Sequence, residues 1–313
     1  LKKILLRLLK QTLFAIRSRL SPHQFFVLSS VVVGALSALA AIVLKFFVHT
    51  IGEWINYFDS TYQQLSLHAF FPIVGITLTV LYIKYGLKGT LSKGSSEIGY
   101  AIARKSSKLP VNQTYSHIVT SALTVGFGGS VGLESPMVST GSAMGSNYGS
   151  FFNLSYKDRT VLLACGAASG IAAAFNAPIA GVLFAIEVLL TDATVAAFIP
   201  IIIAAATGAL LSKIILAEEI ILSFSLQQPF NYNNIHFYII LGLVAGFVAL
   251  IYRRVLEGSE KFFAARKNNR SKIIIGGASL DIMFLIFPSL FGEGYESIKC
   301  WPMIIHCRLP MEA

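Results

Sequence analysis

A single carboxylate in a glycine-rich stretch is the group best placed to do chemistry in this sequence. Glu134 lies within residues 126–136, GFGGSVGLESP, where a helix can begin near Pro136 because proline is favoured in the first helical turn. Backbone N–H groups at a helix start attract anions, so Gly132, Leu133 and Ser135 are candidate anion-binding residues beside Glu134. The carboxylate can occupy such a site itself, and can leave it when protonated or displaced by a halide. The alternative is that Glu134 only caps the helix.

A pair of serines could supply further donors to an anion. Ser95 and Ser96 follow Gly94 and precede an amphipathic stretch, where another helix would begin. A serine hydroxyl there can donate to an anion without adding charge, whereas a routine N-cap is the alternative. Both serines are therefore candidates.

A second stretch of small residues, 166–181, interrupts an apolar run. Gly166 and Gly170 form a small-xxx-small face suited to close helix packing, and Asn176-Ala177-Pro178 would end one helix and start the next. Glu187 follows near the end of the run. It is a candidate for proton relay, and pairing with a basic residue or a backbone end is the alternative.

Patterns of hydrolytic or metal-dependent enzymes are missing from the sequence. There is no Walker loop, no HExxH and no Ser/His/Asp order, and the histidines are not clustered. The three cysteines, Cys165, Cys300 and Cys307, lack metal-ligand spacing. We therefore expect no enzyme activity, no bound metal and no cofactor.

The elements that must position these residues follow from composition. Of the 313 residues, 55% are apolar and only 13% are charged, and the mean hydropathy is +0.68. An ordinary soluble domain has about 25% charged residues, so the composition excludes a disordered chain and argues against a soluble enzyme. It predicts an all-α polytopic membrane protein, in which the glycine-rich stretches break the helices. The apolar runs cover residues 25–51, 69–83, 160–190, 193–212, 235–252 and 273–291.

The net charge of +10 has a simple explanation in a membrane protein. In a soluble protein it could indicate nucleic-acid binding, but here Lys and Arg concentrate in residues 1–20, 84–108 and 253–272. Residues 52–67 and 217–234 contain neither Lys nor Arg. Because cytoplasmic loops are enriched in basic residues, the first three segments are predicted to be cytoplasmic and the other two external. No nucleic-acid partner is expected.

Three segments are expected along the chain. Residues 1–24 are predicted to form an amphipathic helix at the membrane surface, with a secretory signal peptide as the alternative. Residues 25–298 form the transmembrane domain, and residues 299–313 form an aberrant or unstructured tail without helical periodicity.

Taken together, these motifs resemble the CLC family of chloride channels and chloride/proton antiporters. Gly132–Pro136 is similar to the family motif G-[KR]-E-G-P, whose glutamate is the external gate, and Ala172–Gly181 resembles the helix pair that follows it. Gly94–Ile98 stands where the family has G-S-G-I-P, whose serine binds the central anion. Gly292–Tyr295 resembles a loop early in the second half of the family fold.

The resemblance runs from about residue 5 to residue 298. It implies a fold of two inverted halves with broken helices, and chloride or a similar small anion as the transported ligand. It also implies a homodimer in the lipid bilayer, with one pore in each subunit.

Departures from the family pattern bear on mechanism. Leu133 replaces a basic residue and Ser135 replaces a glycine. In the antiporters, an internal proton glutamate follows the acid that matches Glu187; here that position is Val188, as in the family's channels. The resemblance therefore implies transport that is channel-like rather than strictly proton-coupled, with chloride/proton antiport as the alternative.

Two further alternatives are open. The chain stops before the family's G-x-F-x-P motif and pore tyrosine, so the resemblance implies an incomplete second repeat. A truncated fragment that does not transport is one alternative. A secondary transporter for another substrate, such as an organic anion, is the other.

Overall fold

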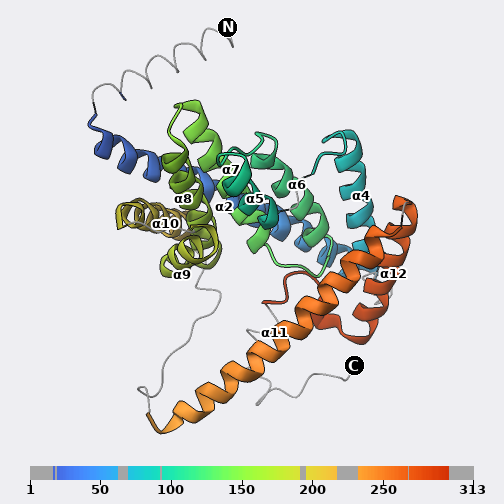
Figure 1. Cartoon of the computed structure of the whole chain (residues 1–313). Coiled ribbons are helices and arrows are strands. Elements are labelled where there is room, and N and C mark those ends of the chain that lie inside the picture. Colours follow the sequence, from blue (N-terminus) through green and yellow to red (C-terminus); the bar gives the residue numbers. More distant parts are fainter. Residues whose placement is uncertain are drawn as a thin grey trace.

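The computed structural model describes residues 17, 20–62, 70–91, 94–190, 195–216, 232–266 and 268–295. Every regular element in these ranges is a helix, which confirms the predicted fold class (Figure 1). The α-helices are α2 (Pro22–Tyr62), α4 (Phe71–Tyr85), α5 (Ser95–Arg104), α6 (Gln113–Gly126), α7 (Glu134–Phe151), α8 (Tyr156–Phe175), α9 (Pro178–Phe184), α10 (Val195–Leu216), α11 (Ile235–Ala264) and α12 (Asn269–Ile286). The π-helix η1 (Ala185–Leu189) and the 3₁₀ turns η2 (Tyr232–Asn234) and η3 (Pro288–Leu290) complete the set.

Four described helices are long and apolar enough to cross a membrane. The apolar segments are Pro22–Ile55, Tyr156–Phe175, Ala197–Leu216 and Ile235–Ala264. Helix α4 covers most of residues 69–83, which were predicted to span the membrane. Its 15 residues are fewer than the roughly 20 that a spanning helix needs.

The core is a bundle of α2, α7, α8 and α10, which pack on one another. Close packing depends on glycine: a Cβ on Gly141 would collide with the carbonyl oxygen of Gly166, and a Cβ on Gly166 with that of Gly141. Helices α2 and α8 are also tied by Ser169, whose hydroxyl donates to the Gly34 carbonyl at 2.6 Å. The small residues at 166–170 therefore serve packing, as in other membrane helix pairs.

Both predicted helix breaks are present. Helix α6 ends at Gly126 and α7 begins at Glu134, and Gly128 between them has a φ of +92°, which side-chain-bearing residues rarely adopt. Helix α8 ends at Phe175, its C-cap Asn176 has the left-handed conformation common after helix ends, and Pro178 begins α9.

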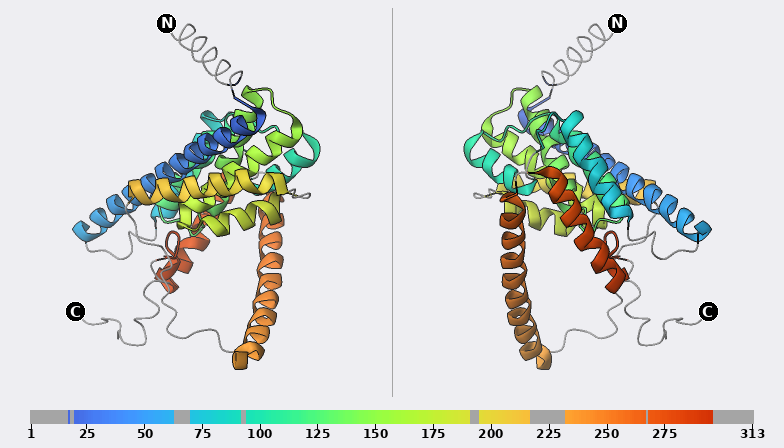
Figure 2. Two further views of the ribbon diagram at one scale, coloured as in Figure 1. Left: turned by 90° about the vertical axis from the view of Figure 1, so that its left-hand side faces the viewer. Right: turned by 90° about the vertical axis from the view of Figure 1, so that its right-hand side faces the viewer.

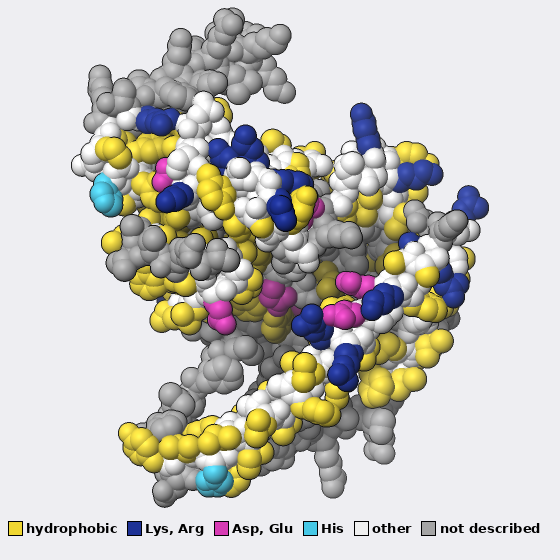
Figure 3. Space-filling view, in the orientation of Figure 1, with side chains coloured by type: hydrophobic (Ala, Val, Ile, Leu, Met, Phe, Trp, Pro, Cys, Tyr) yellow, Lys and Arg dark blue, Asp and Glu magenta, His cyan; other side chains and the backbone are white. Residues whose placement is uncertain are grey.

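Residues 232–266 and 268–295 form a limb beside the bundle. In Figures 1 and 2, α11 stands apart from the bundle, and none of its residues is buried. Hydrophobic side chains cover much of its visible surface in Figure 3. Helix α12 packs against α4, where a Cβ on Gly277 would collide with Ile73.

Two expected loop boundaries are wrong, and other expected segments fall outside the described ranges. Residues 253–264 continue α11 rather than beginning a loop, and the Arg253 guanidinium donates to Glu257 one turn later at 2.8 Å. Residues 52–62, expected to be an external loop, are the last turns of α2. The expected surface helix lies largely outside the described residues, as do residues 217–231 and the tail 299–313, and α2 already begins at Pro22.

Candidate anion site and its gate

Two helix starts meet at the centre of the candidate site. Helix α5 begins just after Gly94 and α7 begins at Glu134, and the two helices are in contact. A Cβ placed on Gly94 would lie 3.2 Å from Ser135 Oγ and 3.8 Å from Ser139 Oγ. The backbone N–H groups of both starts carry partial positive charge, so their convergence favours an anion.

The Glu134 carboxylate turns back over the start of its own helix. A Cβ on Gly132 would overlap Glu134 Oε2, so the carboxylate occupies the space that a side chain at position 132 would need. The phenol of Tyr295 donates a hydrogen bond to Glu134 Oε1, although 161 residues separate the two in sequence. The carboxylate therefore lies at a helix start and is held there by a group from the second half of the chain.

The turn that carries Tyr295 is fastened to the glycine-rich break at two further points. The Gly292 N–H donates to the Gly128 carbonyl at 3.1 Å, and the Phe291 ring fills the space where a Cβ of Gly128 would lie. The Tyr295 ring also meets the Phe175 ring edge-on, with centroids 6.0 Å apart. The positive φ and missing side chain of Gly128 therefore have a structural role, because they leave room for the turn whose Tyr295 contacts Glu134.

The predicted anion-binding residues lie near one another, but their side chains differ in burial and in orientation. Leu133 is 3% exposed and packs in a core cluster, so only its backbone faces the site. The Ser135 side chain is exposed beside Gly94, and Ser96 is also exposed. Ser95 opens α5, but its side chain lies outside the described part of the structure. The N-cap of α5 is Gly94, which has no side chain to cap the helix.

Three buried hydroxyl side chains on α7 were not predicted as candidate site residues. Ser139, Thr140 and Ser142 are at most 2% exposed, and their hydroxyls have no hydrogen-bond partner in the described structure. Unpartnered buried polar groups are costly and uncommon, and one explanation is a ligand. Ser139 lies closest to the meeting point of the helix starts. The spacing of Ser135, Ser139, Ser142 and Ser146 on one helix face was the available clue.

Glu187 lies in the π-helix η1, which contacts α5 and α8. Its side chain is exposed, as is that of Val188, whereas Ala185 and Leu189 are buried. Within the described ranges Glu187 forms no ion pair, so the expected pairing with a basic residue is not found there. The described residues also contain no group of three or more His, Cys, Asp or Glu side chains able to hold a metal.

Comparison with known proteins identifies the family. Residues 75–302 match the family model of voltage-gated chloride channels. The chain belongs to this family. The resemblance drawn from the glutamate, serine and Asn-Ala-Pro motifs is thereby confirmed.

Similar proteins include both kinds of family member. A protein of Ralstonia nicotianae named as a ClcB-like chloride channel protein is 27% identical over 278 residues, 85% of this chain and 65% of its own length. The H(+)/Cl(-) exchange transporter ClcA of Vibrio vulnificus is 29% identical over 182 residues, 56% of this chain and 39% of its own length. The CLC chain thus spans less than two thirds of these curated relatives.

Solved structures support the fold. A slow cyanobacterial Cl-/H+ antiporter superimposes with a TM-score of 0.77 at 21% identity, covering 90% of this chain and 68% of that chain. A CLC-type fluoride/proton antiporter superimposes with a TM-score of 0.72 at 28% identity, covering 88% of this chain and 69% of that chain.

Proposed function

We propose that this protein moves chloride or a similar small anion across the membrane, with Glu134 as the gate. Ser95 or Ser96, together with the backbone at Gly132, Leu133 and Ser135, binds the anion. The observation that carries this proposal is the position of the Glu134 carboxylate, which lies over the start of α7 where α5 also begins. A carboxylate and a halide compete for the same partial positive charge.

Gating follows from that competition. While Glu134 is ionised and held by Tyr295, it occupies the place of an anion at the helix start. Protonation removes the charge, and a halide can then replace the side chain. An acid at membrane depth is costly, so an acid found there is a candidate functional residue.

We further propose channel-like transport. Val188 stands next to Glu187, at the position that resembles the internal proton acceptor of the antiporters, and a valine side chain cannot bind a proton. Antiport is the second candidate, because similar proteins include a named H(+)/Cl(-) exchange transporter and a CLC-type fluoride/proton antiporter.

The test uses the protein reconstituted in liposomes that hold a chloride gradient. We expect chloride efflux with almost no change in external pH, because Val188 leaves the usual proton route without an acceptor. Liposomes without protein provide the baseline for both ions. Uphill proton movement driven by chloride would overturn channel-like transport, and the absence of chloride flux would overturn anion transport itself.

The orientation belongs to the same proposal. The amino terminus, residues 84–108 and residues 253–272 face the cytoplasm, because Lys and Arg concentrate there. Ser60→Cys and Ser225→Cys, each made with Cys300 and Cys307 replaced by serine, should react with an impermeant thiol reagent added outside. Labelling only from the cytoplasmic side would reverse the orientation. We also propose a homodimer with one pore per subunit, the arrangement that the family resemblance implies.

A further inference from the structure

Helices α4 and α12 form a wedge-shaped pocket. The two helices touch where Gly277 meets Ile73. From that contact they separate, because Lys84 of α4 and Lys272 of α12 line one open pocket of about 460 Å³. Ile76 and Lys84, which both line the pocket, are eight residues apart, so the pocket extends about 12 Å along α4.

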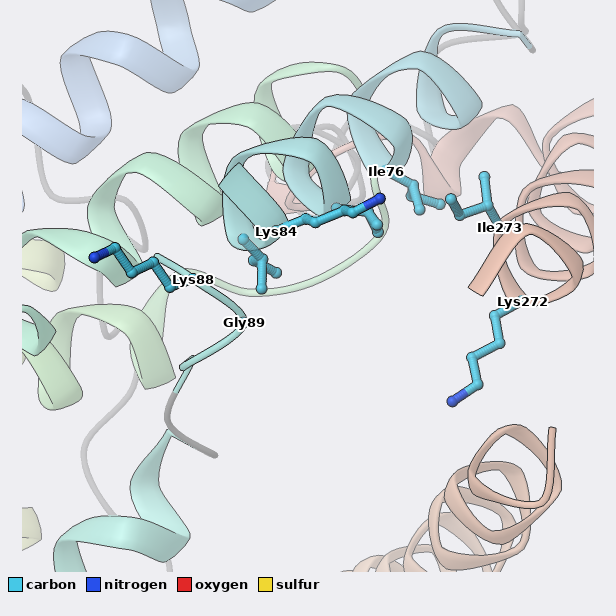
Figure 4. Close-up of a pocket in the computed structure, with 8 residues that line it drawn as sticks. Ile76, Lys84, Lys88, Gly89, Lys272 and Ile273 are labelled. Carbon is cyan, nitrogen blue, oxygen red and sulfur yellow. The ribbon is translucent and has the colours of Figure 1, made fainter. Parts of the chain in front are cut away.

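The walls of the pocket are aliphatic. Ile76, Val80 and Ile83 recur at helical spacing on one face of α4, and Ile273 lies on α12. Figure 4 shows Ile76 and Ile273 facing each other across the gap. The inner part of the wedge is therefore suited to hydrocarbon.

The mouth of the pocket is basic. Lys84, Lys88 and Lys272 line it, with Gly89 in the turn between helices. In Figure 4, Lys84 extends toward the gap and Lys272 extends from the start of α12 into the opening, while Lys88 lies at the rim with its ammonium turned outward. Each lysine ammonium is carried on a flexible four-carbon stem, so it can turn toward an anion in the mouth.

No acid on the lining segments neutralises this charge. Residues 70–91 and 268–280 contain neither Asp nor Glu. None of the three lysines forms an ion pair within the described ranges. Tyr85, beside Lys84, is 72% exposed, and its ring lies 5.2 Å from the Lys84 ammonium. Exposed tyrosine and lysine at a helix end are typical of the boundary between hydrocarbon and headgroups.

We propose that this wedge binds an anionic phospholipid, whose phosphate lies among Lys84, Lys88 and Lys272 and whose acyl chain lies against Ile76, Val80 and Ile83. Basic pockets between membrane helices are suited to such headgroups. A free phosphate would use only the mouth and leave the aliphatic wall uncovered, so the lipid fits both parts. The lysine-rich loops place the site in the leaflet that the proposed orientation assigns to the cytoplasm.

The test measures lipid binding to the purified protein by native mass spectrometry. Dioleoylphosphatidylglycerol is titrated against wild type and against the triple variant Lys84→Gln/Lys88→Gln/Lys272→Gln. Each lysine contributes about fivefold, so the variant should lose roughly 100-fold in affinity. The matched control, Lys157→Gln/Lys213→Gln/Lys261→Gln, removes the same charge from exposed positions elsewhere and should retain wild-type affinity.

A second variant separates a shaped site from diffuse charge. Val80→Trp fills the wedge without changing any charge, and should weaken phosphatidylglycerol binding at least tenfold. Equal binding of phosphatidylcholine, or equal losses in the control triple variant, would overturn the proposal. Displacement of the lipid by millimolar glycerol 3-phosphate would instead assign the site to a soluble anion.

Discussion

The bundle and helix α11 of the limb differ in how their glycines are packed. In the bundle, Gly141 and Gly166 let two helix backbones touch, and neither position has room for a single methyl group. In α11, a methyl group added at Gly242, Gly246 or Gly258 would have no other atom within 4 Å beyond its own stretch of helix. The bundle is therefore held together by close packing of its own helices, whereas the glycines of α11 make no such contact.

The two regions meet at the candidate gate, Glu134. The limb contacts the rest of the molecule at three points. Gly277 packs against Ile73, and Phe291 and Gly292 contact Gly128. Tyr295 donates a hydrogen bond to Glu134. The last two attachments fall on the glycine-rich break and on the candidate gate itself. Helices α5 and α7 therefore supply the candidate anion site, and the limb supplies the group that holds the candidate gate.

The largest effect is expected from a methyl group at the contact between α7 and α8. Gly141→Ala places a Cβ against the Gly166 carbonyl oxygen and should lower the free energy of unfolding by about 1–3 kcal/mol or more. Thermal unfolding in detergent, followed by loss of monodisperse protein, measures the change.

The matched control for that variant lies in the limb. Gly246→Ala adds the same methyl group to α11 in open space, and should raise helix stability by about 0.5–1 kcal/mol or leave it unchanged. Equal destabilisation by the two variants would remove the contrast between the regions.

A smaller effect is expected at the junction. Tyr295→Phe keeps the ring on Phe175 but removes the hydrogen bond to Glu134. A hydrogen bond to a charged group contributes about 1.5–3 kcal/mol, so chloride flux at neutral pH should rise on the order of tenfold. Chloride efflux from liposomes is the measurement, and Tyr252→Phe, on exposed α11, is the control. Unchanged flux in Tyr295→Phe would show that the tyrosine does not hold the gate.

Much of the fold could be predicted because its causes are local. The glycines at 126–132 and the Asn176-Ala177-Pro178 triplet break helices through their own backbone preferences, and both breaks are present. The apolar runs likewise determine where α2, α8 and α10 lie. The limit of α11 was predicted wrongly because basic residues were taken as a loop, whereas Arg253 and Glu257 pair along a continuing helix.

The parts of the site that were missed depend on contacts between distant residues. The role of Tyr295 depends on the packing of the 291–295 turn against Gly128. No local sequence pattern predicts that contact. Ser139 was missed for the same reason, since its hydroxyl matters only because α5 begins beside it. The buried side chain of Leu133 follows from packing against the bundle, and it restricts the role of that residue to its backbone.

The most direct test of the gate is the pH dependence of chloride flux in Glu134→Gln. The amide has nearly the shape of the carboxylic acid but cannot ionise, so it does not compete with an anion at the start of α7. Chloride efflux from liposomes should be measured as external pH falls from neutral to acidic, in wild type and in the variant. Wild-type chloride flux should rise on acidification, and flux through the variant should be equally fast at every pH. A variant that keeps the full wild-type pH dependence would contradict the assignment of Glu134 as the gate.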